Sequence, residues 1–140
     1  MASYDPRRAI DTLTVGKVSR ASAQQRAGRA GRTGPGRCVR LWSERDHGRR
    51  SEFESPEVHR IDLAEAVLYL KSGGVEEIRD FRWMDAPEED SLRRAEDLLE
   101  MLGAVDEEGG LTEIGNSMVR YPLHPRAARL LEAAKREGCV

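Results

Sequence analysis

Two apolar stripes with the three- and four-residue spacing of helix faces lie between residues 62 and 103. The first follows Asp62, a suitable capping residue, and stops before Gly73. The second starts near Pro87, which suits a first helical turn, and stops before Gly103. The pattern therefore predicts two amphipathic helices, whose apolar faces are Leu63, Ala66, Val67 and Leu70 in the first and Leu92, Ala95, Leu98, Leu99 and Leu102 in the second.

The remainder of the second half predicts a small hairpin followed by two more helices. Residues 104–105 and 111–112 flank a polar, glycine-rich turn. Thr112 is placed to cap a helix that carries apolar residues at 114, 118 and 119, and Pro125 is placed to start a last helix. The apolar face expected in that last helix comprises Ala127, Leu130, Leu131 and Ala134. Helices with a small β-wing are typical of a winged-helix module.

The first sixty residues alternate less regularly. Residues 10–18 are β-branched and predict a strand or half a hairpin, and residues 37–42 predict another strand. Ser22 is a suitable N-cap for a short Ala-rich helix over 23–30, which the following glycines interrupt. Residues 43–56 are polar and predict a linker.

Composition separates the chain into two halves of opposite charge. Residues 1–50 hold 12 Lys and Arg against 4 Asp and Glu, a formal charge of +8, whereas residues 51–140 hold 11 against 21, a charge of −10. The basic half suits a polyanion such as RNA, DNA or a nucleoside triphosphate. With 140 residues, the chain has room for one domain, or for one domain and a piece of another.

Other features of the composition exclude several classes of protein. No apolar run is long enough to span a membrane, and no secretory signal is visible. Cys38 and Cys139 lie far apart and are expected to be free thiols in a reducing compartment, the cytoplasm. No CxxC or HxxxH spacing occurs, so we expect no metal site.

The stretch that carries candidate chemistry is Gln25–Arg32, in which Arg26, Arg29 and Arg32 recur every three residues. Guanidinium forks match phosphate oxygens, and a nearby glutamine can orient a water molecule or contact a terminal phosphate. The interleaved glycines allow another backbone or a phosphate to approach closely. Taken alone, the stretch also fits a disordered Arg/Gly-rich segment that binds RNA.

The pattern Gln-Arg-x-Gly-Arg-x-Gly-Arg over 25–32 resembles motif VI of superfamily 2 helicases. Its flanks, 18–24 and 33–42, are similar to the DEAH-box branch of ATP-dependent RNA helicases. Further similarity to the winged-helix and ratchet regions of that branch lies in Phe81-Arg82-Trp83-Met84-Asp85-Ala86-Pro87, Leu111-Thr112-Glu113-Ile114-Gly115 and Pro122-Leu123-His124-Pro125-Arg126. The Leu-His-Pro-Arg run looks most like the bacterial HrpB group, and the resemblance covers nearly the whole chain.

The resemblance implies that Arg29 and Arg32 are catalytic arginine fingers that also bind ATP, and that Gln25 contacts the γ-phosphate or the attacking water. ATP and Mg²⁺ would then be bound by the parent protein, whose first RecA-like domain carries Gly-x-x-x-x-Gly-Lys-[Ser/Thr] and Asp-Glu-x-His. Neither pattern occurs in this sequence. We therefore expect a fragment that is inactive alone and holds no ATP or Mg²⁺ by itself.

Other positions of the motif receive secondary roles from the same resemblance. Arg26, Gly28 and Gly31 would maintain the local structure of motif VI. Residues 4–18 resemble the end of a segment that contributes an RNA-wedging hairpin, so Arg7 and Arg8 would contact nucleic acid. The implied partners are RNA, ATP and the N-terminal RecA-like domain, with no membrane and a monomeric, cytoplasmic protein.

The expected fold is mainly α with small β elements: a winged-helix module preceded by a partial RecA-like α/β segment. Its expected boundaries are 1–50 for the tail of the second RecA-like domain, 51–61 for a linker, 62–122 for the winged helix and 123–140 for the first ratchet helix. The strands of 1–50 would belong to a sheet whose other strands are absent. Four apolar side chains would then have few partners, namely Val15, Val18, Val39 and Leu41.

A second hypothesis of another class is a stand-alone winged-helix module with a basic arm that binds nucleic acid or protein without catalysis. Helix 113–120 carries little net positive charge for a sequence-reading helix. The remaining basic cluster is expected to be a solvated face or to pair with the acidic half; its members are Arg37, Arg40, Arg45, Arg49 and Arg50. An upstream Walker A motif and DEAH box in the same reading frame would favour the helicase.

Overall fold

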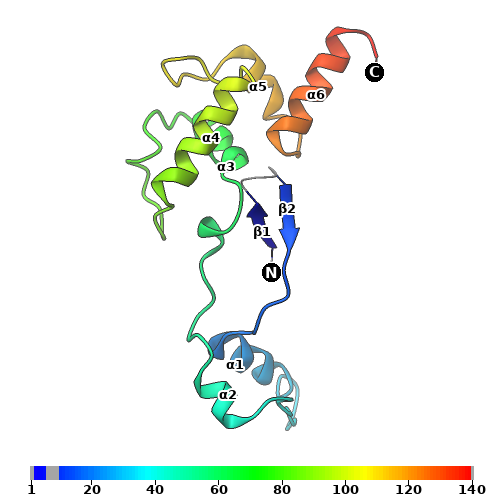
Figure 1. The fold of residues 1–140 in the computed structure, drawn as a ribbon. Coiled ribbons are helices and arrows are strands. Elements are labelled where there is room, and N and C mark those ends of the chain that lie inside the picture. The colour runs from blue at the N-terminus through cyan, green and yellow to red at the C-terminus, as the bar shows by residue number, and fades with distance from the viewer. Residues whose placement is uncertain (1, 6–9, 140) are drawn as a thin grey trace. The chain divides into compact units, whose positions relative to one another are not determined.

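The computed structural model describes residues 2–5 and 10–139 of the chain. These divide into two compact units, with the boundary between Glu57 and Val58. We call residues 1–57 unit 1 and residues 58–140 unit 2. The described residues form two strands, six α-helices and one 3₁₀-helix, η1 (Glu57–His59), which confirms a mainly helical fold with small β elements (Figure 1).

Unit 1 begins with an antiparallel pair of strands, β1 (Ala2–Asp5) and β2 (Ile10–Leu13). Ser3 lies opposite Thr12, and the Thr12 hydroxyl donates a hydrogen bond to the Ser3 carbonyl at 2.9 Å. The strand predicted over 10–18 thus forms in its first four residues as half of a hairpin. Beyond Leu13 the backbone has no paired strand within the described residues.

Helix α1 (Arg20–Arg29) starts three residues earlier than the capping residue Ser22 predicts. The N-cap is Ser19, which has extended backbone angles and is 3% exposed. Its Oγ accepts a hydrogen bond from the Ser22 N–H at 3.1 Å. The prediction that Ser22 caps the helix was wrong. Ser19, three residues earlier, is the cap, and Ser22 lies in the first turn, where its free N–H is the group that Ser19 satisfies.

The loop after α1 differs from the sequence prediction in two places. Residues 37–42 form no strand, because the described chain offers them no partner strand. Val15, Val39 and Leu41 are 105%, 78% and 92% exposed, as expected for strands without their sheet, whereas Val18 is half-buried. The segment predicted as a linker over 43–56 instead contains a short helix, α2 (Glu44–Gly48), which Ser43 caps through its hydroxyl.

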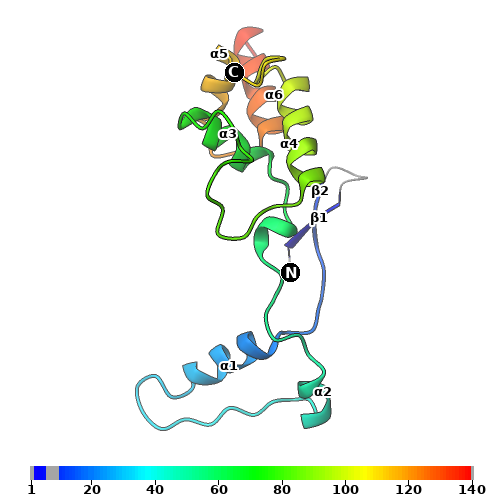
Figure 2. The same ribbon diagram turned by 90° about the vertical axis from the view of Figure 1, so that its left-hand side faces the viewer.

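Unit 2 contains α3 (Ala64–Ser72), α4 (Glu89–Met101), α5 (Glu113–Met118) and α6 (Pro125–Arg136). Helix α3 packs along α4 and α5 packs on α6, and α3 also contacts α5 and α6 (Figures 1 and 2). The largest fully buried side chains of this core are Leu63, Val67, Ile78, Leu99, Met118 and Pro125. Within the described residues, no helix combines the length and the apolar character needed to cross a membrane.

Two of the four predicted helix starts are confirmed as predicted. Thr112 is the N-cap of α5, and its Oγ1 accepts the Gly115 N–H at 3.0 Å. Asp62 Oδ1 accepts the Ala64 N–H at 2.8 Å, but the N-cap of α3 is Leu63, one residue later than predicted. Pro125 occupies the first turn of α6. Helix α4 begins after Glu88, so Pro87 precedes the helix instead of lying in its first turn.

The hairpin predicted as a wing is small, and the apolar face predicted for the last helix does not match the buried face of α6. The hairpin over 104–112 consists of a single bridge between Val105 and Leu111, with Gly109 at a φ of 79° in its turn. On α6, Ala128 is fully buried whereas Leu130 is 69% exposed. The face that meets the core is therefore centred near Ala128 rather than on the predicted Leu130 side.

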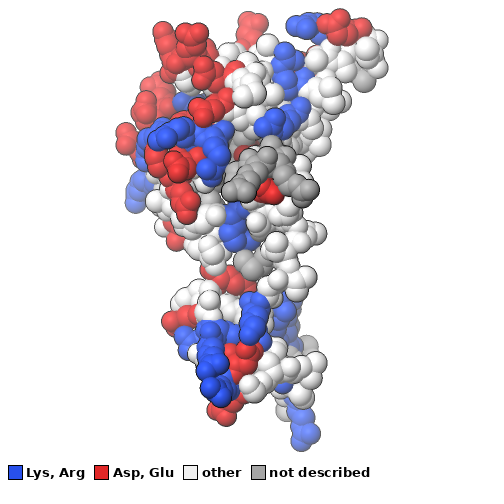
Figure 3. Space-filling view, viewed as in Figure 1, with Lys and Arg blue, Asp and Glu red and all other residues white. Residues whose placement is uncertain are grey.

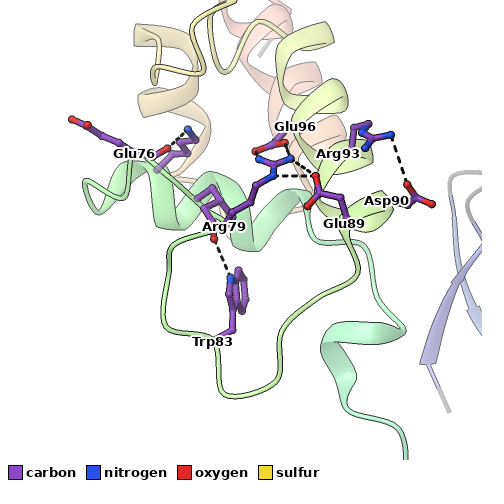
Figure 4. A network of polar contacts seen from close by, with 9 residues as sticks. Glu76, Arg79, Trp83, Glu89, Asp90, Arg93 and Glu96 are labelled. Carbon is purple, nitrogen blue, oxygen red and sulfur yellow. Dashed lines mark hydrogen bonds and ion pairs between the residues drawn. The ribbon is translucent and has the colours of Figure 1, made fainter.

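Arg79 connects the loop after α3 to α4 (Figure 4). Its guanidinium donates to Glu89 at 2.7 Å and to Glu96 at 2.9 Å, and Trp83 Nε1 donates to the Ile78 carbonyl at 3.1 Å. Hydrogen bonds to Glu96 and then Glu89 raise the pKa of Arg79, and the bond from Arg79 lowers the pKa of Glu89. These contacts fix the loop that contains the predicted Phe81–Pro87 segment.

Gly115→Ala is expected to lower the free energy of unfolding of unit 2 by about 1–3 kcal/mol, because overpacking a tight contact forces the backbone to shift. An added Cβ would overlap the Ala104 carbonyl oxygen. That oxygen accepts the N–H of Thr112, the N-cap of α5, at 3.1 Å. Urea denaturation followed by circular dichroism measures the change. Asn116→Ala, at the exposed neighbouring position, is the control, and equal stability of the two variants would contradict this packing argument.

Candidate functional site

The residues of the predicted motif gather at the carboxyl end of α1. Gln25 and Arg29 are one helical turn apart on the same side, and Arg26 lies three residues before Arg29. Arg32 follows in the turn after the helix. All four side chains are exposed, so the structure presents the motif at a surface of unit 1.

The three arginines are available to a ligand. No hydrogen bond or ion pair joins Arg26, Arg29 or Arg32 to another described residue through its side chain. Cations are favourable at a helix carboxyl end, where free carbonyl groups carry partial negative charge. An anion is therefore attracted here by the guanidinium groups alone, in contrast to sites built on a helix amino end.

The glycines of the motif leave open space. A Cβ added at Gly28 would have no heavy atom within 4 Å, and one at Gly31 would lie 3.9 Å from the Gly34 carbonyl oxygen. Their role in a close approach stays a prediction. Sequence reasoning missed Gly36, where a Cβ would overlap the Ala30 carbonyl, so the loop returns directly against the end of α1 (Figure 2).

The remaining basic cluster separates into paired and unpaired members. Arg50 pairs with Asp46 at 2.7 Å, which is a partner from the basic half and not from the acidic half. Arg40 donates to Gln24 at 3.0 Å. The other three side chains are exposed, namely Arg37, Arg45 and Arg49. The spacing of four between Asp46 and Arg50 is a signal that sequence reasoning did not use.

Several other candidate positions are accounted for. Arg7 and Arg8 lie outside the described residues. His124 accepts the Arg126 N–H at the start of α6 and lies 3.3 Å from Asp62, so its contacts are structural. His47 accepts a hydrogen bond from Trp42 at 3.4 Å.

The described residues fit part of an ATP site. The Arg29 and Arg32 guanidiniums and the Gln25 amide are donors suited to phosphate oxygens. No group of three or more His, Cys, Asp or Glu side chains in the described chain is arranged to hold a metal ion.

Unit 2 carries a large acidic surface. Many acidic side chains of unit 2 are visible in Figure 3, with basic side chains among them. A hollow of this unit lies between α3, α4 and the wing. The carboxylates that line it are Glu76, Glu77, Glu96, Asp97, Glu100, Asp106, Glu107 and Glu108. Such a surface repels a polyanion. Basic side chains line a different hollow of unit 2, namely Arg129, Lys135 and Arg136, so the arginines of unit 1 are candidate phosphate contacts because of their spacing.

A family model and two solved structures both relate this chain to helicases. Residues 95–123 match the family described as the helicase-associated domain HA2, winged-helix. The crystal structure of the Escherichia coli DEAH/RHA helicase HrpB superimposes with a TM-score of 0.83 and 35% identity over 94% of this chain and 17% of that protein. A second structure, the E. coli DExH-box NTPase HrpB, gives 0.80 and 36% over 96% of this chain and 17% of that protein.

The identity extends over both units and includes the residues that precede the HA2 match. The chain spans about a sixth of the length of the solved structures that it matches. With the arginine-rich end of α1 in unit 1 and the winged helix in unit 2, the chain belongs to the DEAH/RHA helicase family and contains its helicase-associated domain.

Proposed function

We propose that this chain works as part of an ATP-dependent RNA helicase in which Arg29 and Arg32 are arginine fingers. Gln25 contacts the γ-phosphate or the attacking water, and ATP with Mg²⁺ is bound by a RecA-like domain outside this sequence. Similarity to an E. coli DEAH/RHA helicase and to an NTPase supports this proposal. Arg26, Gly28 and Gly31 shape the motif, and Arg7 and Arg8 contact RNA.

One observation carries the proposal: the guanidinium groups of Arg29, at the end of α1, and of Arg32, in the bend that follows, are exposed and pair with no described residue, and hydrogen bonds hold the start of that helix. Fixed positive charges that meet the γ-phosphate stabilise the negative charge that develops during its transfer. Donors that meet the transferred phosphoryl group mainly in the transition state act more on the rate than on nucleotide binding.

The apolar surface of unit 1 supports a place within a larger sheet. Val15, Val39 and Leu41 are exposed outside any helix or strand, and the remaining strands of a RecA-like domain would cover them. In this arrangement the winged helix is a coupling module of residues 62–122, followed by the first ratchet helix. The free, exposed Cys38 and Cys139 are compatible with a cytoplasmic, monomeric protein.

The isolated 140-residue chain is expected to show no ATP hydrolysis and weak ATP binding, because its sequence contains neither the phosphate-cradling Gly-x-x-x-x-Gly-Lys-[Ser/Thr] pattern nor the Asp-Glu-x-His pattern. A steady-state phosphate-release assay with and without RNA measures this. RNA-stimulated turnover by the chain alone would refute the proposal. The reading frame provides a second check, since an upstream Walker A motif and DEAH box distinguish a helicase from a stand-alone binding module.

A further inference from the structure

We infer that Arg50 is a positioning residue that fixes the start of α1 and thereby holds the arginine fingers in place. The inference rests on the proposed function of Arg29 and Arg32. Arg50 Nη2 and Nε donate to Asp46 Oδ2 at 2.7 and 3.1 Å, and Nη1 donates to the Val18 carbonyl at 3.1 Å. One side chain thus joins α2 to the residue directly before the N-cap of α1.

The backbone after Arg50 completes the attachment. The Ser51 and Glu52 carbonyls accept the Arg20 and Ala21 N–H groups, each at 2.9 Å. These are the first two residues of α1, and their amides have no acceptor within the helix. Segment 50–52 therefore bonds to the chain on both sides of Ser19, and the first turn of α1 is held by main-chain and side-chain contacts together.

The environment of Arg50 shows why arginine is required here. Its side chain is 8% exposed, and its Cζ lies 4.2 Å above the centroid of the Trp42 ring. Lys17 binds the other Asp46 oxygen at 2.7 Å, and the bonds from Lys17 and Arg50 lower the pKa of Asp46. Only a planar fork can stack on an indole while it donates to a carboxylate and a carbonyl.

The orientation of α1 at its first turn determines where its last residues lie, because the helix is a single rigid element. A helix of ten residues is about 15 Å long, so a small tilt at Arg20 displaces the guanidinium of Arg29 by a larger distance. A misplacement of about 1 Å can lower a rate about 100-fold. The contacts of Arg50 thus act on catalysis through α1, without contact to a phosphate.

The test uses Arg50→Ala and Arg50→Lys in the full-length helicase, with Arg49→Ala as a matched control at an exposed neighbour. Arg50→Ala should lower kcat about tenfold or more with a change in the KM for ATP below about twofold, and Arg50→Lys should recover part of the loss. In an Arg29→Ala background, Arg50→Ala should cost about twofold or less, because residues that act as a unit are not additive.

A second readout does not depend on ATP hydrolysis. In the 140-residue chain, Arg50→Ala should accelerate hydrogen exchange of the Arg20 and Ala21 amides, whereas Arg49→Ala should not. Unchanged exchange, or an equal loss of kcat with and without Arg29, overturns the inference and leaves the proposed function standing. An unchanged kcat in Arg29→Ala overturns the proposed function and the catalytic part of this inference with it.

Discussion

Alanine at Arg29 or Arg32 is expected to lower kcat for ATP hydrolysis about 100-fold or more in the full-length helicase, with a smaller change in nucleotide binding. Each guanidinium is exposed and pairs with no described residue, so its removal costs the folded chain little. Each substitution removes an interaction made mainly in the transition state, when negative charge develops on the transferred phosphoryl group. Steady-state kinetics and equilibrium binding of a nucleotide analogue separate the two effects.

Arg49→Ala is the matched control for these variants, because Arg49 is an exposed arginine of the same unit outside the motif. Its kcat should stay within about twofold of wild type, since exposed substitutions away from a site usually have small effects. Wild-type ATP hydrolysis in the Arg32 variant would remove that residue from the catalytic assignment. If Arg29→Ala and Arg32→Ala lower only the affinity for ATP and leave kcat unchanged, these arginines bind the nucleotide and are not arginine fingers.

The helices of unit 2 could be predicted from the sequence because each one buries a face against another element of the same unit. The stripe of α4 has the spacing of a helix, and Leu92, Leu98 and Leu99 are buried as predicted. Glycines with positive φ at 74, 103 and 138 follow α3, α4 and α6. The error on α6 arose because its neighbours leave Leu130 uncovered, which periodicity alone does not reveal.

Unit 1 was harder to predict because its contacts join distant positions. Segment 37–42 has the composition of a strand, yet a strand forms only where a partner accepts its hydrogen bonds. The helix α2 is five residues long and depends on the Ser43 cap and on Asp46, which also binds Lys17 across 29 positions. Such a contact leaves no periodic signal in the sequence.

At the candidate site, too, local features could be predicted from the sequence, whereas contacts between distant positions could not. The spacing of Gln25, Arg29 and Arg32 identified the exposed surface, because helical geometry follows from local sequence. The attachment of α1 through Arg50 did not follow, since the Val18 carbonyl that it binds lies 32 positions away. The candidate groups of the motif can therefore be recognised in the sequence, whereas the contacts that hold the start of α1 become visible only in the structure.

Leu99→Ala is expected to lower the free energy of unfolding of unit 2 by about 2–5 kcal/mol, because deletion of a buried leucine removes apolar contacts and leaves a cavity. Leu99 is 0% exposed in a core that α3 and α4 share. A domain of about 80 residues has a stability of roughly 4–12 kcal/mol, so the loss is a large fraction of it. Urea denaturation followed by circular dichroism measures the change, with Met101→Ala as the control on the same helix at a position that is 78% exposed. Equal midpoints for the Leu99 and Met101 variants would show that α4 does not form the core of unit 2.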